Sequence, residues 1–239
     1  MLKAIFFDLD GSLLPLDEQE FTKVYFDLIS DYMQQYGYDK EKLINVILEG
    51  TKRMYKNNGQ KTNEEVFWEY FEGEYGSKKL QDKVYFNEFY ENGFKKTKKC
   101  CCENSLAKDI VDYAKDKNLH LILSTNPIFP RIATLQRMNY IGLKQEDFDY
   151  ITTYENSSYT KPNPKYFESL LSMFNLKPEE VVVFGNNDLE DYLCAKQANI
   201  DCYLINNNLI IHDNLNLKIN PITMNDVIST IEFEIEERK

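Results

Sequence analysis

The sequence is poor in the residues that build several common kinds of catalytic and metal site. It contains only two histidines, His120 and His212, and neither has the spacing of a Ser-His-Asp triad or of a metal site. The five cysteines are an odd number, and three of them are consecutive at Cys100–Cys102. That spacing is a poor one for zinc, and we expect free thiols in a reducing, cytoplasmic compartment.

Long hydrophobic runs and an excess of positive charge are also missing. No stretch of eighteen apolar residues occurs, so we expect no membrane-spanning segment. Asp8 and Asp10 interrupt the N-terminal apolar run, which argues against a signal peptide. The net charge of −11 argues against nucleic acid and anionic membranes as partners, because phosphate groups attract net positive charge. A small phosphorylated metabolite remains compatible, and the oligomeric state stays open.

The apolar residues that are present predict a parallel sheet. Five short apolar runs read as strands, at residues 2–8, 119–124, 150–154, 181–184 and 202–205. Their apolarity is continuous rather than alternating, as in strands that are buried on both faces. Helical patterns separate the last four runs, so we expect an α/β fold, a Rossmann-like parallel sheet with helices on both faces.

Residues 16–95 break this alternation. Four helical stretches follow one another there without a strand, and Thr62 and Glu65 have the spacing of a capping box at the start of the third. We therefore expect an all-helical insert at 16–95 and an α/β core formed by 1–15 and 96–239. The aromatic residues of the insert are expected to form its core.

Two acidic side chains end the first predicted strand. Asp8 and Asp10 are followed directly by Gly11, and like charges about 4 Å apart repel by roughly 4 kcal/mol at an effective dielectric constant near 20. A metal cation, another positive charge or a retained proton would relieve this repulsion. A solvated turn is the alternative interpretation, because Asp and Gly are common in turns.

Three further loops carry polar groups close to predicted strand ends. Thr125 and Asn126 follow the second strand, Lys161 lies in the Pro-rich segment 161–164, and the fourth strand leads into the acidic segment 185–191. Ligands of parallel α/β sheets bind beyond the carboxyl ends of the strands. These loops therefore predict one pocket suited to a phosphate group.

The order and spacing of these four segments resemble the haloacid dehalogenase-like (HAD) hydrolase superfamily. The Asp-x-Asp-Gly segment at 8–14, Thr125–Asn126, the Lys-Pro-x-Pro segment at 161–164 and the glycine-acid segment at 185–191 correspond to its motifs. The helical insert after the first motif resembles the C1-type cap of the superfamily. Details of segments 125–130 and 154–156 are similar to a subgroup of uncharacterised bacterial members.

The resemblance implies a role for each matching residue. Asp8 is expected to be the nucleophile, and Asp10 the general acid and base. Thr125 and the backbone amide of Asn126 are expected to bind the phosphoryl group, with Lys161 neutralising charge. The resemblance also implies Mg²⁺ as cofactor, with ligands expected from Asp8, Asp10, Asn187 and Asp191.

The sequence departs from the family pattern in the last motif. An acid is usual at the first metal-binding position, but this chain has Asn187 there in the shorter register and Asn186 in the longer one. We favour Asn187 from the sequence and expect weaker Mg²⁺ binding, because an amide oxygen lacks the charge of a carboxylate. Asp188 would compensate only if the loop turned it toward the site.

The motifs favour Mg²⁺-dependent hydrolysis of small phosphomonoesters through an aspartyl-phosphate. The asparagine in the last motif keeps other functions open. One is a weakened or non-catalytic protein that binds a phosphorylated ligand or a partner protein. A 2-haloacid dehalogenase-like hydrolase is another, although Asp10 argues against it because dehalogenases lack the second acid of the first motif. A phosphomutase is the last.

Overall fold

A parallel sheet forms the centre of the computed structural model, which describes residues 1–215 and 217–239. Within these residues, five strands pair in the order β3-β2-β1-β4-β5, and every pairing is parallel. The strands are β1 Ala4–Phe7, β2 His120–Leu123, β3 Tyr150–Ile151, β4 Val181–Gly185 and β5 Asp201–Leu204. The predicted parallel α/β fold is confirmed, although β3 covers only Tyr150–Ile151 and is shorter than the expected run 150–154.

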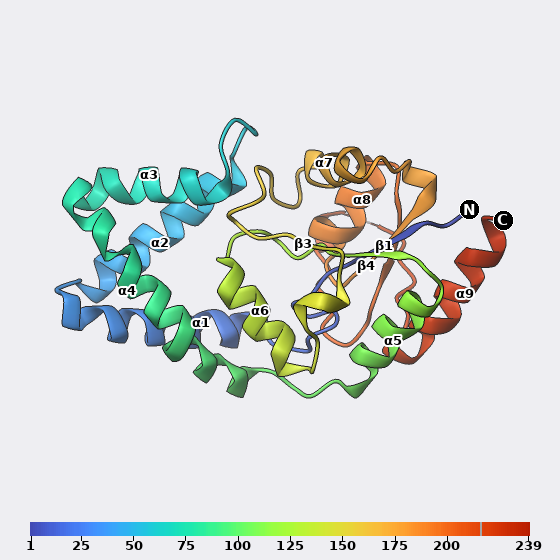
Figure 1. The fold of residues 1–239 in the computed structure, drawn as a ribbon, viewed down its shortest axis with the longest axis horizontal. Coiled ribbons are helices and arrows are strands. Elements are labelled where there is room, and N and C mark those ends of the chain that lie inside the picture. Colours follow the sequence, from blue (N-terminus) through green and yellow to red (C-terminus); the bar gives the residue numbers. More distant parts are fainter. Residues whose placement is uncertain (216) are drawn as a thin grey trace.

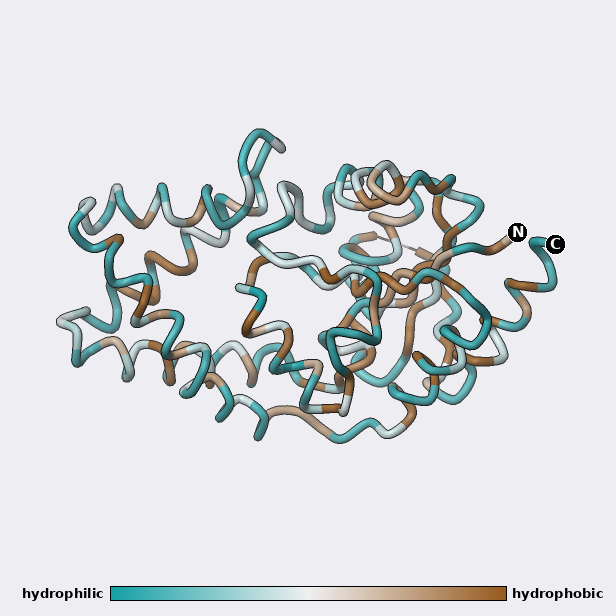
Figure 2. Tube along the Cα trace, viewed as in Figure 1, coloured by the Kyte–Doolittle hydropathy of each residue, from teal (hydrophilic) through white to brown (hydrophobic). Residues whose placement is uncertain are grey.

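Helices cover both faces of this sheet (Figure 1). Alternate strand residues point to opposite faces, so Ile5 and Phe7 join one buried cluster while Ala4 and Phe6 join the other. The first cluster includes residues of α5 Ser105–Asp116, α6 Arg131–Tyr140 and α9 Val227–Glu237, and the second includes those of α7 Lys165–Phe174 and α8 Cys194–Gln197. The strands are hydrophobic along most of their length (Figure 2), as burial on both faces requires.

The predicted helical insert lies beside the sheet as a separate layer of helices (Figure 1). Its helices are α1 Glu18–Met33, α2 Lys40–Tyr55, α3 Asn63–Tyr75 and α4 Lys83–Glu88. Thr62 and Glu65 form the expected capping box at the start of α3. Phe71 is fully buried and its ring packs against Trp68 and Phe86, so this part of the aromatic set is core.

The last helical stretch of the insert continues past residue 95, where the sequence suggested its end. After α4 the chain forms a π-helical turn at Phe89–Gly93 and a 3₁₀ segment at Phe94–Cys100. The two connections to the core then meet, because Leu16 and Cys101 form an antiparallel bridge. The bridge marks the junction between the insert and the sheet domain.

Hydrogen bonds between insert and core hold the C-terminal end of α2 and the start of α3 over the carboxyl edge of the sheet. The Asn63 side chain donates to the backbone oxygen of Pro127 (3.0 Å), and the Glu64 backbone N–H donates to that of Tyr154 (2.8 Å). The Tyr55 hydroxyl donates to Glu190 (3.1 Å). The insert therefore acts as a cap. No described helix combines the length and the apolarity needed to cross a membrane.

Candidate active site

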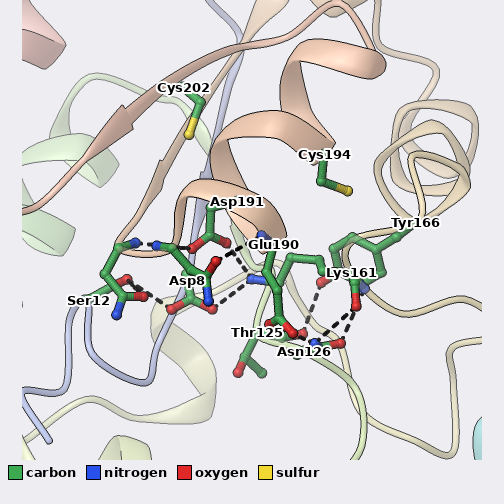
Figure 3. Close-up of polar contacts among 12 residues, drawn as sticks. Asp8, Ser12, Thr125, Asn126, Lys161, Tyr166, Glu190, Asp191, Cys194 and Cys202 are labelled. Carbon is green, nitrogen blue, oxygen red and sulfur yellow. Dashed lines mark hydrogen bonds and ion pairs between the residues drawn. The ribbon is translucent and has the colours of Figure 1, made fainter. Parts of the chain in front are cut away.

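The predicted polar segments meet in one cavity of about 150 Å³ at the carboxyl edge of the sheet, under the cap. We call it the rim pocket. Asp8 and Asp10 follow β1, Thr125 and Asn126 follow β2, Lys161 precedes α7, and Asp191 lies beyond β4. All six residues line the pocket, and Figure 3 shows five of them converging.

Lys161 links two of the carboxylates. Its ammonium group is buried and donates to Asp8 Oδ1 (2.8 Å) and Asp191 Oδ1 (2.6 Å). Burial alone would lower the pKa of Lys161, but Asp191 and Asp8 raise it well above its usual value, so the lysine is charged. Burial raises the pKa of Asp8 to about 8 against the opposing effect of Lys161. One ammonium is thus shared by two carboxylates, and further positive charge near Asp8 would favour its ionised form.

Asp191 is held on both of its oxygens. While Oδ1 accepts from Lys161, Oδ2 accepts from the backbone N–H groups of Asn186 (3.0 Å) and Asn187 (3.1 Å). The carboxylate packs so closely on Gly185 that a Cβ there would lie 2.3 Å from its Cγ. In this arrangement Asp191 fixes Lys161 and the loop after β4. Its expected role as a metal ligand stays a prediction.

The two asparagines of this loop point in different directions. Asn187 Oδ1 accepts from the N–H groups of Leu189 and Glu190 (both 3.0 Å) and so caps the helical turn Asp188–Leu193. Asn186 donates through Nδ2 to the backbone oxygen of Asn208 (2.7 Å), which directs its Oδ1 toward Ser12 Oγ (3.2 Å). The geometry therefore favours Asn186 rather than the preferred Asn187 as the residue that faces Asp8.

Ser12 connects Asn186 to the predicted nucleophile. Its hydroxyl lies 2.8 Å from Asp8 Oδ2 and 3.2 Å from Asn186 Oδ1. Because a hydroxyl carries one proton, it donates to only one of these oxygens at a time. Three oxygen atoms thus gather on this side of Asp8. Gly11 is required beside them, because it has a φ of +76° and a Cβ there would lie 2.1 Å from Asn186 Nδ2.

Asp188 is turned away from the rim pocket. Its buried carboxylate accepts from the backbone N–H of His212 (2.7 Å) and pairs with the His212 ring. It therefore does not supply the charge that the asparagine lacks. His212 fixes a loop, as expected of a structural histidine, and His120 is an exposed residue beside Asp149.

Thr125 and Asn126 follow β2 and line the rim pocket, and their expected phosphoryl-binding role stays a prediction. The Thr125 backbone oxygen accepts from Thr152 Oγ1 (2.7 Å) and the Tyr166 hydroxyl (3.0 Å), which fixes the strand end. Among the described residues, none accepts a hydrogen bond from Thr125 Oγ1 or from the Asn126 backbone N–H. Both donors are available to a ligand in the rim pocket.

The Asn126 side chain joins three segments at the mouth of the pocket. Its Oδ1 accepts from the Lys161 backbone N–H (3.2 Å), and its Nδ2 donates to Glu190 (2.8 Å) and to the Tyr55 hydroxyl of the cap (3.2 Å). Sequence reasoning missed Tyr55, because nothing local in the sequence connects this cap residue to the motifs. It assigned no role to Glu190, although Glu190 lies within the segment 185–191.

Arg137 is the most informative residue that the sequence did not reveal. It is 1% exposed and forms an ion pair with Asp10 Oδ2, and its guanidinium lies 4.6 Å from the centre of the Phe129 ring. Burial raises the pKa of Asp10, while Arg137 and Lys161 oppose that rise. Asp10 Oδ1 is buried without a hydrogen-bond partner among the described residues. In the sequence, the one hint of its burial is that Arg137 directly precedes Met138, an apolar position of α6.

The oxygen donors of the rim pocket fit Mg²⁺, although they carry less negative charge than a set made of carboxylates alone. Asp8 Oδ2, Asn186 Oδ1 and Ser12 Oγ are hard oxygen donors close together, and such oxygens suit this ion. The described part of the chain has no group of three His, Cys, Asp or Glu side chains placed to hold a metal. The expected weaker binding of Mg²⁺ stays a prediction.

The structure thus combines a helical cap, a parallel sheet and a buried lysine that joins two aspartates at the carboxyl ends of the strands. Residues 5–205 match the family model of the haloacid dehalogenase-like hydrolases, and the chain belongs to this family.

Similar proteins include a curated enzyme and solved structures. The glyceraldehyde 3-phosphate phosphatase of Methanothermobacter thermautotrophicus is 26% identical over 214 residues, which cover 87% of this chain and 88% of the relative. A HAD phosphatase from Thermococcus onnurineus is 18% identical, with a TM-score of 0.59 over 96% of this chain and 98% of that one. A 2-haloacid dehalogenase from Pseudomonas syringae pv. Tomato is 16% identical, with a TM-score of 0.66 over 98% of this chain and 99% of that one. At such identities the structural matches show the fold alone.

Proposed function

We propose that this protein is a cytoplasmic phosphatase that hydrolyses small phosphomonoesters. The observation that carries the proposal is the buried Lys161 ammonium 2.8 Å from Asp8 Oδ1, next to the unengaged donors of Thr125 and Asn126. This arrangement suits a phosphoryl group, because fixed donors stabilise charge that spreads over its oxygens. The similarity to a curated phosphatase over most of both chains supports it. The described cysteines are all free thiols, which suits a reducing compartment.

The reaction would proceed in two displacements. A carboxylate oxygen of Asp8 attacks phosphorus, the bond from phosphorus to the ester oxygen breaks, and Asp10 gives its proton to the departing alcohol. Water then attacks the aspartyl-phosphate and gives a proton to Asp10, and the bond from Asp8 to phosphorus breaks to release phosphate. Asp10 Oδ1, which has no protein partner among the described residues, is the oxygen available for both proton transfers.

Each remaining residue has a positioning or charge-balancing role. Lys161 neutralises Asp8 as negative charge approaches it, and Asp191 holds Lys161 in place. Thr125 and the Asn126 backbone N–H would hold the phosphoryl oxygens. Asp8, Asn186 and the loop that carries Asp10 and Ser12 would hold Mg²⁺, which would neutralise charge between the carboxylate and the phosphoryl group when bound.

One observation favours a second function. Asn186 stands where the longer register of the last motif expects an acid, and loss of that charge would weaken the metal and slow turnover. A protein that binds a phosphorylated ligand without hydrolysing it is therefore the second candidate.

Phosphate release from a panel of phosphomonoesters, measured over a magnesium titration, tests the proposal. We expect metal-stimulated release that Asp8→Asn lowers by about 10⁴-fold or more, because the nucleophile is lost. Asp116→Asn is the matched control, since Asp116 is exposed on α5. Binding of phosphate esters with no release would favour the second candidate. Halide release from a 2-haloacid without phosphate release would refute phosphoryl chemistry.

A further inference from the structure

A second cavity, of about 170 Å³, lies between the cap and the core. We call it the cap chamber. Helices α1 to α4 and the 3₁₀/π segment after them line it from the cap, and residues 128–130 and Tyr154 line it from the core. Characteristic lining side chains are those of Tyr25, Ile47, Met54, Trp68, Tyr90 and Phe129. The aromatic residues of the insert, expected to be core only, thus also border a cavity.

The cap chamber adjoins the rim pocket. Thr22, Ile128 and Phe129 line both cavities. The centre of the Phe129 ring lies 4.6 Å from the Arg137 guanidinium, which pairs with Asp10 in the rim pocket. It also lies 5.3 Å from the centre of the Tyr25 ring in the chamber. The two cavities are therefore neighbours that share part of their walls.

The chemistry of the two cavities differs sharply. Five carboxylates, Lys161 and Arg137 line the rim pocket, whereas no charged residue among those described lines the chamber. The buried hydroxyls of Tyr25 and Tyr90 bond to each other (2.8 Å), and the Tyr154 hydroxyl accepts from Trp68 Nε1 (3.4 Å). Each of these three hydroxyls already takes part in a bond within the wall, and no described charged side chain lines the chamber. A charged ligand group would therefore lose its hydration there without meeting an opposite charge.

The volume of the chamber matches an aromatic ring. An engineered apolar cavity of about 150 Å³ binds benzene, and the chamber is slightly larger at about 170 Å³. We infer that the substrate is a phosphomonoester whose leaving group carries an uncharged apolar part about the size of a phenyl ring, held in the cap chamber. This inference rests on the proposed phosphatase function and specifies its substrate class.

Binding of two phosphonates that cannot be hydrolysed tests the inference independently of turnover. With Mg²⁺ present, we expect benzylphosphonate to bind about 10- to 100-fold more tightly than ethylphosphonate in calorimetric titrations, because its ring leaves water for an apolar site. The ratio of kcat/KM for benzyl phosphate over ethyl phosphate should show the same preference. Both esters release a primary alcohol, so leaving-group chemistry is closely matched.

Two variants locate the preference in the chamber. Thr51→Trp fills it from α2 at a half-buried position, and Leu48→Asp places a charge at its edge, where Leu48 is 40% exposed. Each should reduce the benzyl-to-ethyl ratio to within about 3-fold of unity, since the ring loses its apolar site. Val84→Trp is the control, because Val84 is 51% exposed on α4 and lines neither cavity; it should keep the ratio.

The outcomes separate this inference from the proposed function. Equal or undetectable binding of the two phosphonates, or a preference that survives both chamber variants, would overturn the inference. Hydrolysis of both esters at equal rates that depends on Asp8 would overturn it while supporting the phosphatase. A benzyl preference in binding without phosphate release from either ester would support the chamber and count against the phosphatase.

Discussion

The two oxygens of Asp8 face different surroundings. Oδ1 meets the buried ammonium of Lys161, which also binds Asp191, and Asp191 is in turn held by two backbone N–H groups. Oδ2 meets the hydroxyl of Ser12, beyond which lies the amide oxygen of Asn186. The Lys161 side contains a cation for its carboxylates, whereas the Asn186 side is a group of oxygens without one.

This difference indicates that the Lys161 side of Asp8 stabilises the fold, whereas the Asn186 side is suited to binding a ligand. Buried carboxylates that are paired and hydrogen-bonded are satisfied by the protein itself. Oxygens gathered without a cation favour a bound cation or a retained proton. Burial, with smaller contributions from Asp191 and Asp10, raises the pKa of Asp8 to about 8 although Lys161 opposes the rise. We therefore expect changes on the Lys161 side to harm folding and activity together, and changes on the other side to alter proton and metal binding.

The largest effect is expected from Lys161→Met. This variant leaves Asp8 and Asp191 buried without their shared cation, so the free energy of unfolding should fall by about 3–5 kcal/mol and kcat by about 10³-fold or more. Urea unfolding and phosphate release measure the two effects. The double variant Lys161→Met/Asp191→Asn should recover part of the stability but none of the activity. A single variant as stable as the wild type would show that Lys161 does not balance these charges.

A smaller effect is expected from Arg137→Met. Burial raises the pKa of Asp10 and Arg137 opposes the rise, so removing Arg137 raises this pKa further. Because a general acid must be protonated to act, the basic limb of the pH profile of kcat/KM should move to higher pH. We expect kcat to fall by about 10- to 100-fold because Asp10 loses the group that orients it.

Arg131→Met is the matched control for Arg137→Met. Arg131 begins the same helix, and its described hydrogen bonds to Glu155 come from the backbone N–H rather than the side chain. Its pH profile should match that of the wild type. A basic limb that stays in place in Arg137→Met would contradict the assignment of that limb to Asp10.

The smallest effect is expected from a pair of single substitutions, which tests whether Asn186 or Asn187 binds the metal. Asn186→Asp adds a carboxylate next to Asp8 and should lower the magnesium midpoint by about 10-fold. Asn187→Asp should leave the midpoint nearly unchanged, because aspartate caps a helical turn about as well as asparagine. The opposite ranking would restore the register suggested by the sequence.

Thermal unfolding gives the same pair a second readout. Without Mg²⁺, Asn186→Asp loses the hydrogen bond to the Asn208 backbone oxygen, because a carboxylate oxygen cannot donate to it. The free energy of unfolding should fall by about 1–3 kcal/mol. Added Mg²⁺ should restore much of this stability by binding the folded state. The stability of Asn187→Asp should respond to Mg²⁺ as the wild type does.

The sequence predicts the sheet and the meeting of its motifs for a simple physical reason. Continuous apolar runs such as Val181–Phe184 identify strands buried on both faces, and parallel strands bring their carboxyl ends to one edge. Asp8, Thr125, Lys161 and Asp191 therefore share a pocket although they are far apart along the chain. The capping box at Thr62 is equally local, and the sequence placed it correctly.

The directions of side chains and the spaces between elements depend instead on how the chain packs in three dimensions. Asn186 and Asn187 are identical in chemistry, and the Asn208 backbone and the Gly11 turn determine which of them faces Asp8. Arg137 reaches Asp10 only because α6 packs beside the first loop. The cap chamber exists only where four helices meet the core. Local sequence sets periodicity and turns, whereas contacts between distant residues depend on how whole elements pack, and no short pattern encodes that packing.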